Sequence, residues 1–181
     1  SFGLGLERQL DAAALRGAVD AALALDGCVM IEQFISGIEL TCSVLDAEAG
    51  KAPRALPLTE IRPKTAAFFD YHAKYTPGAA EEITPARIAP ERAAEIQEIA
   101  VHAHHIVGCR HWSRSDFILD EHGPVWIEVN TIPGLTPTSL FPQAAAAAGI
   151  PYAALMALFV DAAITEARCA GEWEMQHGVT A

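Results

Sequence analysis

The sequence has little of what marks a secreted, disulfide-stabilised protein. Only four of its 181 residues are cysteines, and none forms a C-x-x-C pair (Cys28, Cys42, Cys109, Cys169). A disulfide scaffold is typically shorter and denser in cysteine. We therefore expect free thiols and a cytoplasmic location.

Long apolar runs and basic charge are also scarce. No stretch reaches the roughly 18 to 20 apolar residues that a membrane-spanning helix needs. Lys and Arg number 12 against 23 Asp and Glu, which gives a formal net charge of −11. Nucleic acids and anionic membranes are bound through Lys and Arg that displace counterions, so we expect neither as a partner.

The periodicity of apolar residues predicts an α+β chain with a mostly antiparallel sheet flanked by helices. Strand-like patterns cover residues 28–34, 38–45, 55–61, 114–119 and 125–130, and helical spacing covers 7–25, 90–107, the alanine run 144–148 and a last helix from Pro151. Residues 62–88 contain prolines, a glycine and several aromatic residues without a clear period. A loop of this length and composition is typical of a segment that closes over a ligand.

The pair of strands at 114–119 and 125–130 carries the most informative polar residues. Alternate side chains of a strand share a face, so Glu128 and Asn130 point the same way, about 7 Å apart. If Asp116 pairs with Glu128, then Arg114 pairs with Asn130, and all four side chains share one face, whereas a slip of one residue would separate them. The opposite face, formed by Val125, Ile127 and Val129, is predicted to pack against a core.

The chemistry of this predicted face suits a hard cation beside an anion. Two carboxylates and an amide oxygen (Asp116, Glu128, Asn130) are ligands that Mg²⁺ prefers and that zinc and copper do not. The guanidinium of Arg114 is a planar donor for phosphate or an oxyanion. The alternative is a solvated sheet face that carries an exposed ion pair.

The histidines and serines of the chain offer a competing set of candidates. His102, His104 and His105 spread around the predicted helix 90–107 instead of converging, which predicts that they lie on its surface. Ser36, Ser113 and Ser139 lack a neighbouring His–Asp pattern in the sequence, so we do not expect a serine nucleophile.

The segment Glu-Val-Asn-Thr-Ile-Pro-Gly-Leu-Thr-Pro-Thr-Ser-Leu-Phe-Pro (128–142) resembles the signature of the D-alanine–D-alanine ligases, a branch of the ATP-grasp superfamily. Three further blocks resemble the family in the same order. They are Glu-Gln-Phe-Ile-Ser-Gly-Ile-Glu (32–39), similar to its nucleotide hinge, Phe-Asp-Tyr-His-Ala-Lys-Tyr (69–75), similar to its loop motif, and Arg-Ser-Asp-Phe (114–117), similar to its metal strand. The opening Ser1-Phe2-Gly3 resembles the end of its glycine-rich phosphate loop, so we expect a C-terminal fragment, truncated at the N-terminus.

The resemblance implies a domain organisation and a nucleotide site. Residues 1–38 would be a remnant of the central ATP-binding subdomain, 39–168 the C-terminal catalytic ATP-grasp subdomain, and 169–181 a frayed tail. The adenine would contact Glu32 and the backbone of Gln33 and Ile35. Glu39 would bind the ribose, and Lys74 and Ser1 would contact the phosphates.

The resemblance also implies catalytic roles. Asp116 and Glu128 would hold one Mg²⁺, and Glu128 and Asn130 a second, with Mn²⁺ able to substitute. The other implied residues contact the substrates: Arg114 and the N–H of Gly134 at the oxyanion, Tyr75 in the closing loop, and Ser139 with the backbone of Leu140 at the carboxylate of the second D-alanine. Ser113 and Ser115 depart from the family, which more often has small or apolar residues there.

The implied activity is ATP-dependent ligation of two D-alanines through a D-alanyl phosphate, for peptidoglycan precursors. The implied full-length enzyme is a cytoplasmic homodimer, and the fragment alone is expected to be inactive. Three alternatives stay open: another ATP-grasp carboxylate–amine ligase, a D-alanine–D-lactate ligase, and a nucleotide-binding module without turnover. The Lys74-Tyr75 pair favours the dipeptide ligase, because the D-alanine–D-lactate branch resembles this loop less. The complete polar set at 114, 116, 128 and 130 argues against a non-catalytic module.

Overall fold

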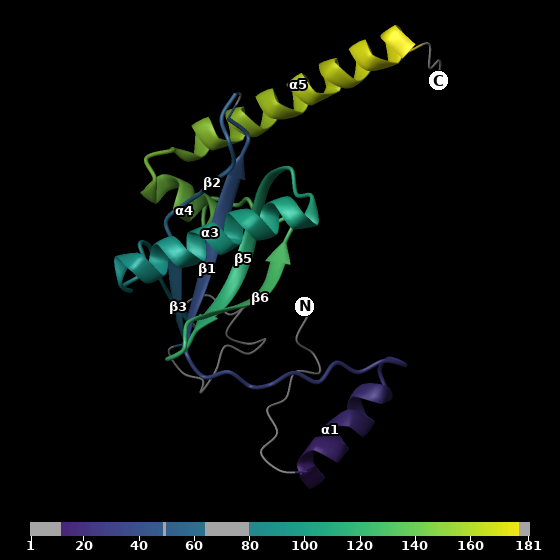
Figure 1. The fold of residues 1–181 in the computed structure, drawn as a ribbon, viewed down its shortest axis with the longest axis vertical. Helices are drawn as coiled ribbons and strands as arrows, with labels where there is room; N and C mark the ends of the chain where they lie inside the picture. Colours follow the sequence, from purple (N-terminus) through teal and green to yellow (C-terminus); the bar gives the residue numbers. More distant parts are fainter. Residues whose placement is uncertain (1–11, 49, 64–79, 178–181) are drawn as a thin grey trace. The chain divides into compact units, whose positions relative to one another are not determined.

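The computed structural model describes residues 12–48, 50–63 and 80–177 (Figure 1). The chain divides into two compact units, residues 1–36 with 62–81 and residues 37–61 with 82–181. In the first unit, helix α1 (Ala12–Leu23) has no buried residue. The subdomain boundaries implied by the family resemblance stay a prediction.

The second unit is built on one sheet whose strand order is β4-β3-β1-β5-β6, with β2 paired to β1 beside this path. The strands are β1 (Ile38–Asp46), β2 (Arg54–Ala55), β3 (Thr59–Pro63), β4 (Ala80–Ile83), β5 (His111–Leu119) and β6 (Pro124–Asn130). The pairs β1–β2, β1–β3, β1–β5 and β5–β6 are all antiparallel. The predicted α+β class with a mostly antiparallel sheet is confirmed.

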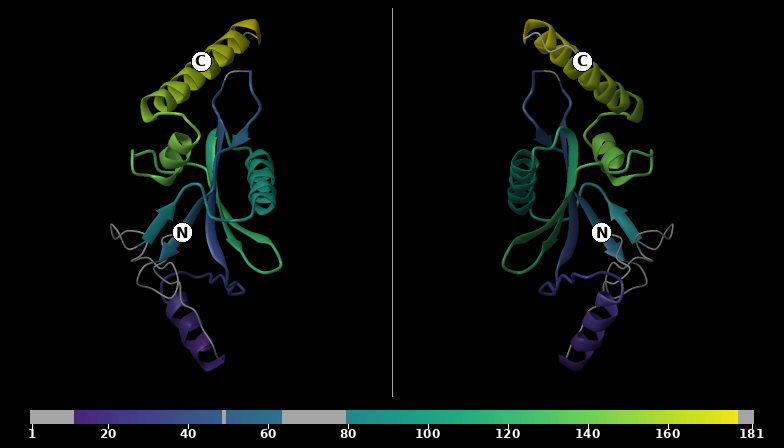
Figure 2. Two further views of the ribbon diagram at one scale, coloured as in Figure 1. Left: turned by 90° about the vertical axis from the view of Figure 1, so that its left-hand side faces the viewer. Right: turned by 90° about the vertical axis from the view of Figure 1, so that its right-hand side faces the viewer.

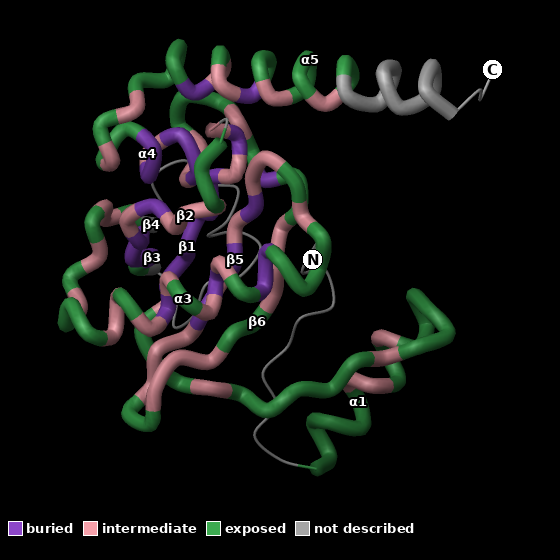
Figure 3. Tube along the Cα trace, turned by 45° about the horizontal axis from the view of Figure 1, so that its top comes forward, coloured by how far each residue is buried: buried purple, intermediate pink, exposed green. Residues whose placement is uncertain are grey.

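Helices cover both faces of this sheet. Helix α3 (Pro90–Val107) lies on one face, and α4 (Leu140–Ala147) with the start of α5 (Tyr152–His177) lies on the other (Figure 2). Strand β1 is buried between them, and Figure 3 shows most of its length as buried. The α3 side packs Leu40, Cys42, Val44, Ile96 and Phe117, and the α4–α5 side packs Leu45, Leu56, Phe141, Leu155 and Phe159.

The residues at the two ends of α3 explain where this helix begins and ends. Pro90 occupies the first turn, where its missing N–H costs nothing, because that group has no partner inside a helix. Gly108 ends the helix with φ of 71° and donates its N–H to the carbonyls of His104 and His105. The predicted helix from Pro90 to Val107 is confirmed.

Three predictions about local structure are wrong. Residues 28–34 form no strand in the described chain, because an isolated apolar segment needs a hydrogen-bonding partner to become one. Strand β4 lies inside the segment 62–88, which was predicted to be a loop. Helix α5 continues through Gly171 to His177, where a frayed tail was predicted, since one glycine costs a helix only about 1 kcal/mol.

In the described part of the chain, no single helix is long and apolar enough to cross a membrane. Helix α4 and residues 152–168 of α5 meet the length and composition criteria only together, and they are bent by 107°. Phe141, Ala145 and Leu155 of this pair belong to the core against the sheet.

Candidate active site on the second face of the sheet

The hairpin β5–β6 has the register that the sequence predicts at the polar residues. Asp116 pairs with Glu128, and Arg114 pairs with Asn130. On the other side of β5, Thr41 pairs with Asp116 and Ser43 with Arg114. The four predicted polar side chains therefore share one face of the sheet with Thr41 of β1.

The turn of this hairpin alone would not produce that register. Asp120 accepts the N–H groups of His122 and Gly123 at 2.7 and 3.0 Å, and this turn pairs Leu119 with Pro124 and Phe117 with Trp126. An uninterrupted ladder would then place Asp116 opposite Ile127. A register shift between Asp116 and Phe117 skips Ile127, and this bulge brings Glu128 opposite Asp116.

The bulge also changes the predicted apolar face of β6. Val125 pairs with Ile118, whereas Val129 pairs with Ser115, so these two valines lie on opposite faces of the sheet. Ile127 is 45% exposed. The prediction that Val125, Ile127 and Val129 pack together against a core is wrong, because it assumed an uninterrupted alternation along the strand.

The carboxylate of Asp116 is the centre of the polar contacts. Arg114 donates to both of its oxygens, from Nε to Oδ1 at 2.9 Å and from Nη2 to Oδ2 at 3.0 Å. Thr41 donates its hydroxyl to Oδ1 at 2.8 Å, and Asn130 donates Nδ2 to Oδ2 at 3.2 Å. Three elements of secondary structure therefore meet at one partly buried carboxylate.

The electrostatics of Arg114 reflect an acidic surrounding. Burial by itself lowers the pKa of this guanidinium, but the hydrogen bond and charge of Asp116, with the charges of Glu128 and Glu82, raise it above its ordinary value. Glu82 comes from β4 and accepts a hydrogen bond from Gln143 of α4 at 2.7 Å. Arg114 thus lies among three carboxylates, and a negative surrounding of this kind attracts cations.

The donor set fits a hard cation. Among the described residues no three His, Cys, Asp or Glu side chains cluster as metal ligands, so the candidate set is two carboxylates with the amide of Asn130. Oxygen ligands of this kind suit Mg²⁺. Asn130 turns its nitrogen toward Asp116 here, and a cation beside Asp116 and Glu128 would favour the reversed amide, with the oxygen toward the ion.

A second candidate element is the loop between β6 and α4. Ser139 is the N-cap residue of α4, and its side chain makes no capping hydrogen bond. Its hydroxyl lies 2.8 Å from that of Thr136. A Cβ on Gly134 would lie 2.9 Å from Oγ of Ser139, so only glycine fits without displacing that hydroxyl. A helix N-terminus with a hydroxyl at its cap is a suitable place for a carboxylate.

The predicted nucleotide residues belong to both units of the chain. Glu32, Gln33 and Ile35 lie in a segment of the first unit without regular secondary structure. Glu39 is in β1 of the second unit and pairs with Ile118, on the face that carries Thr41 and Asp116. Ser1, Lys74 and Tyr75 lie outside the described residues.

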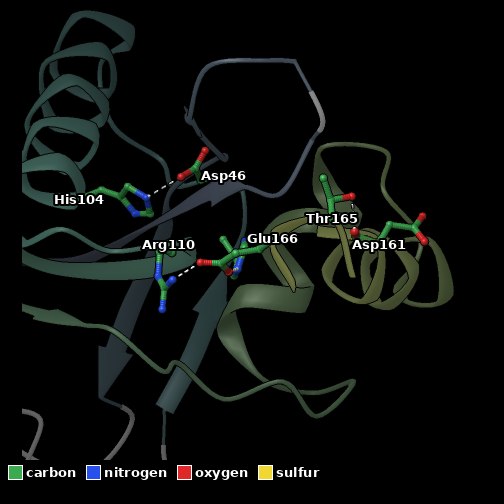
Figure 4. A network of polar contacts seen from close by, with 7 residues as sticks. Asp46, His104, Arg110, Asp161, Thr165 and Glu166 are labelled. Carbon is green, nitrogen blue, oxygen red and sulfur yellow. Dashed lines mark hydrogen bonds and ion pairs between the residues drawn. The ribbon is translucent and has the colours of Figure 1, made fainter. Parts of the chain in front are cut away.

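The opposite face of the sheet contains a polar cluster that the sequence analysis missed. Nδ1 of His104 lies 2.7 Å from Oγ of Ser113, and its Nε2 lies 3.4 Å from Oδ2 of Asp46. Figure 4 shows His104 of α3 pointing toward Asp46 of β1. Burial is the main cause that lowers the pKa of His104, and the hydrogen bond to Asp46 opposes it.

Two predictions about this cluster are wrong. His104 is 0% exposed and does not lie on the helix surface. Ser113 does have a His–Asp neighbourhood, which comes from elements distant in the sequence. Ser113 is itself 0% exposed, so no substrate reaches its hydroxyl, and the cluster is structural.

Ser113 and Ser115, the two serines that depart from the family, differ in whether their hydroxyls are hydrogen-bonded. Ser113 is hydrogen-bonded to His104, whereas the hydroxyl of Ser115 is buried without a partner among the described residues. Both serines face away from the Asp116 side of the sheet, since they alternate with Arg114 and Asp116 along β5. The departures therefore leave the side chains of the polar face unchanged.

Thr41 and Glu82 are the residues of this site that the sequence analysis did not identify. The sequence shows Glu39, Thr41 and Ser43 as a polar stripe along β1. It does not show that this stripe lies beside Asp116 in the folded sheet. Glu82 lay in the segment predicted to be a loop.

Comparison with known proteins gives a consistent result. Residues 2–161 match the family described as D-ala D-ala ligase C-terminus. A D-alanine–D-alanine ligase of Nitratidesulfovibrio vulgaris is 43% identical over 165 residues, which are 91% of this chain and 52% of that protein. The chain spans about half the length of the curated relatives it matches.

Solved structures show the same fold. The D-alanine–D-alanine ligase of Bacillus anthracis in complex with ATP matches with a TM-score of 0.69 and 28% identity, over 86% of this chain and 47% of that one. The VanG D-Ala:D-Ser ligase of Enterococcus faecalis matches with a TM-score of 0.72 and 31% identity, over 88% of this chain and 46% of that one.

Proposed function

This chain belongs to the D-alanine–D-alanine ligase C-terminal family, and we propose that the full-length protein joins two D-alanines at the expense of ATP. In this reaction the carboxylate of the first D-alanine takes the γ-phosphoryl group of ATP, and ADP leaves. The amine of the second D-alanine then attacks the acyl carbon, a C–N bond forms, and phosphate leaves as the amine loses a proton. The product would serve peptidoglycan synthesis in the cytoplasm.

The observation that carries the proposal is the shared face of Arg114, Asp116, Glu128 and Asn130. Phosphoryl transfer depends on positioning and on neutralising phosphate charge more than on covalent help from the protein. Two carboxylates and an amide beside a guanidinium provide both a cation site and a fixed positive donor.

In this proposal Asp116, Glu128 and Asn130 hold two Mg²⁺ ions, with Mn²⁺ as a substitute. When bound, the ions neutralise phosphate oxygens and help to fix the geometry of attack. Arg114 presents its guanidinium to the negative oxygen that develops on the acyl group. The N–H of Gly134 is the second donor to that oxygen.

The second D-alanine is proposed to bind at the start of α4. Its carboxylate would accept hydrogen bonds from the hydroxyl of Ser139 and from the backbone at Leu140. The support is that Ser139 is the N-cap residue and that its side chain is not used as a cap.

The remaining roles follow the family resemblance. We propose that the adenine contacts Glu32 and the backbone of Gln33 and Ile35, and that Glu39 binds the ribose. Lys74 and Ser1 would contact the phosphates, and Tyr75 would belong to a loop that excludes water from the acyl phosphate. We also propose that the full-length protein is a homodimer, and that the 181-residue chain alone makes no dipeptide.

The test of the proposed activity is ATP-dependent phosphate release by the full-length protein with D-alanine as first substrate. D-alanine, D-lactate and D-serine are compared as second substrates, since one similar solved structure is named a D-Ala:D-Ser ligase. We expect D-alanine to give the highest kcat/KM. A higher value with D-lactate or D-serine would make this a ligase of another specificity, and no release with any of them would contradict the proposal.

The residue that tests the mechanism is Glu128. We expect Glu128→Gln to reduce dipeptide formation by more than roughly 100-fold, because a shared metal ligand is lost while the shape is kept. Glu121→Gln is the matched control, since Glu121 lies in the exposed turn of the same hairpin. Near-normal ligation by Glu128→Gln would refute the metal assignment.

A further inference from the structure

Thr41 is a buried residue of β1 to which neither the family resemblance nor the sequence pattern assigned a role. It is 2% exposed and pairs with Asp116 across the β1–β5 ladder. Its hydroxyl lies 2.8 Å from Oδ1 of Asp116 and 3.3 Å from the carbonyl of Ser115. A hydroxyl has one proton to donate, and the shorter contact to a charged acceptor is the stronger one.

Arg114 donates to both oxygens of Asp116, but the contacts from the neighbouring strands distinguish them. Thr41 donates to Oδ1 from the β1 side, and Asn130 donates Nδ2 to Oδ2 from the β6 side, where Glu128 also lies. The hydrogen bond from Thr41 therefore orients the carboxylate so that Oδ2 faces the proposed cation ligands.

Thr41 differs from the other donors to Asp116. In the proposed function Arg114 turns to the acyl oxygen and Asn130 to a cation, so their contacts to Asp116 would change when substrates and cations bind. Thr41 lies in the central strand of the sheet and is β-branched, which restricts its side-chain rotation. Its contact to Asp116 can persist through the whole cycle.

We propose that Thr41 is the positioning residue of Asp116. By donating to Oδ1, it holds the carboxylate in the orientation in which Oδ2 meets a divalent cation together with Glu128. Outer hydrogen bonds of this kind orient metal-ligating carboxylates, and their loss typically weakens metal affinity by about 10- to 100-fold. This inference rests on the metal site of the proposed function.

The test compares Thr41→Val, which removes the hydroxyl and keeps the shape, with Thr41→Ser, which keeps the hydroxyl. Mn²⁺ is titrated into the full-length protein in the presence of ADP, and free Mn²⁺ is measured by electron paramagnetic resonance. We expect Thr41→Val to raise the dissociation constant for Mn²⁺ about tenfold or more. Thr41→Ser should stay within about threefold of the unmodified protein, because its hydroxyl can still reach Oδ1.

Thr59→Val is the matched control. Thr59 pairs with Thr41 from β3, is 1% exposed, and has its hydroxyl 2.6 Å from that of Thr84 instead of a carboxylate. We expect Thr59→Val to lower the thermal unfolding midpoint, as Thr41→Val does, but to leave the affinity for Mn²⁺ unchanged.

Unchanged Mn²⁺ affinity in Thr41→Val, or equal weakening in Thr59→Val, overturns the role of Thr41. If the unmodified protein with ADP binds no more Mn²⁺ than ADP alone, the metal site of the proposed function fails instead.

Discussion

Polar residues alternate between the two faces of strand β5, and the two faces differ in how far they bury these residues. Ser113 and Ser115 face α3 and are fully buried. Arg114 and Asp116 face the other way and keep about a fifth of their side-chain surface exposed, at 19% and 20%. The same strand therefore contributes one sealed and one accessible polar set.

The difference shows that access, more than residue type, decides what a polar cluster can do. Ser113, His104 and Asp46 have the composition of a hydrolase triad, but the serine and the histidine have no exposed surface. The set around Asp116 lacks a nucleophile, yet ligands can reach it. The sealed set contributes to the stability of the fold, and the accessible set is the candidate for chemistry.

The start of β5 is also linked to helix α5. Glu166 forms an ion pair with Arg110 just before β5 and accepts a hydrogen bond from His111 at 3.0 Å, as Figure 4 shows for Arg110. Cys42, packed on the α3 face, has its pKa raised to about 12 by burial, so its thiol stays protonated and unreactive at neutral pH.

The largest expected effect comes from moving one residue of β6 to the wrong face. Deleting Val129 would bring Asn130 opposite Ser115 and away from Asp116, because side chains alternate along a strand. We expect ligation in the full-length protein to fall by more than roughly 100-fold, through loss of a proposed ligand. The measurement is ATP-dependent dipeptide formation, with circular dichroism to check folding.

Deletion of Ile127 is the control for this prediction. Ile127 is the residue that the register shift skips, so its removal leaves Asp116 opposite Glu128 and Arg114 opposite Asn130. Ligation should stay within about tenfold of the unmodified protein. If both deletions were equally inactive, the register would not be the property that separates the two faces.

A smaller effect is expected on the sealed face. Ser113→Ala removes the partner of Nδ1 of buried His104, and leaving such a group unpaired costs about 1 to 3 kcal/mol of unfolding free energy. Ser115→Ala is the contrast, since it removes a hydroxyl that is buried without a partner, and it should be neutral or stabilising. Denaturant unfolding measures both variants.

Neither serine substitution should change kcat by more than about threefold, because both side chains point away from the accessible set. A large loss of kcat in Ser113→Ala, with the fold intact, would give the His104 cluster a role in chemistry. The comparison between sealed and accessible sets would then be wrong.

The smallest expected effect is a dependence of stability on pH. Burial lowers the pKa of His104 in the folded protein, so the unfolded chain takes up a proton that the folded chain does not. The contribution of His104 to the free energy of unfolding is fully present above the pKa of this histidine in the unfolded chain, about 6.5. It decreases as the pH falls below that value toward the lower pKa of His104 in the folded protein. Thermal unfolding between about pH 7.5 and 5.5 should show this decrease, and His104→Gln should reduce it.

The parts of the fold that follow from short sequence patterns were predictable. Pro90 and Gly108 delimit α3, and Asp120 with Gly123 makes the hairpin turn, because capping and turn chemistry act within a few residues. The alternation of Arg114 with Asp116, and of Glu128 with Asn130, predicted one polar face through the two-residue period of a strand.

The tertiary structure decided what depends on distant partners. The sequence does not show that a bulge at Ile127 corrects the register set by the turn. It also does not show that Thr41 lies against Asp116, or that His104 is sealed between α3 and the sheet. Pairing across strands and burial are set by elements far apart in the chain, and their energies are summed only when the whole sheet and its helices pack together.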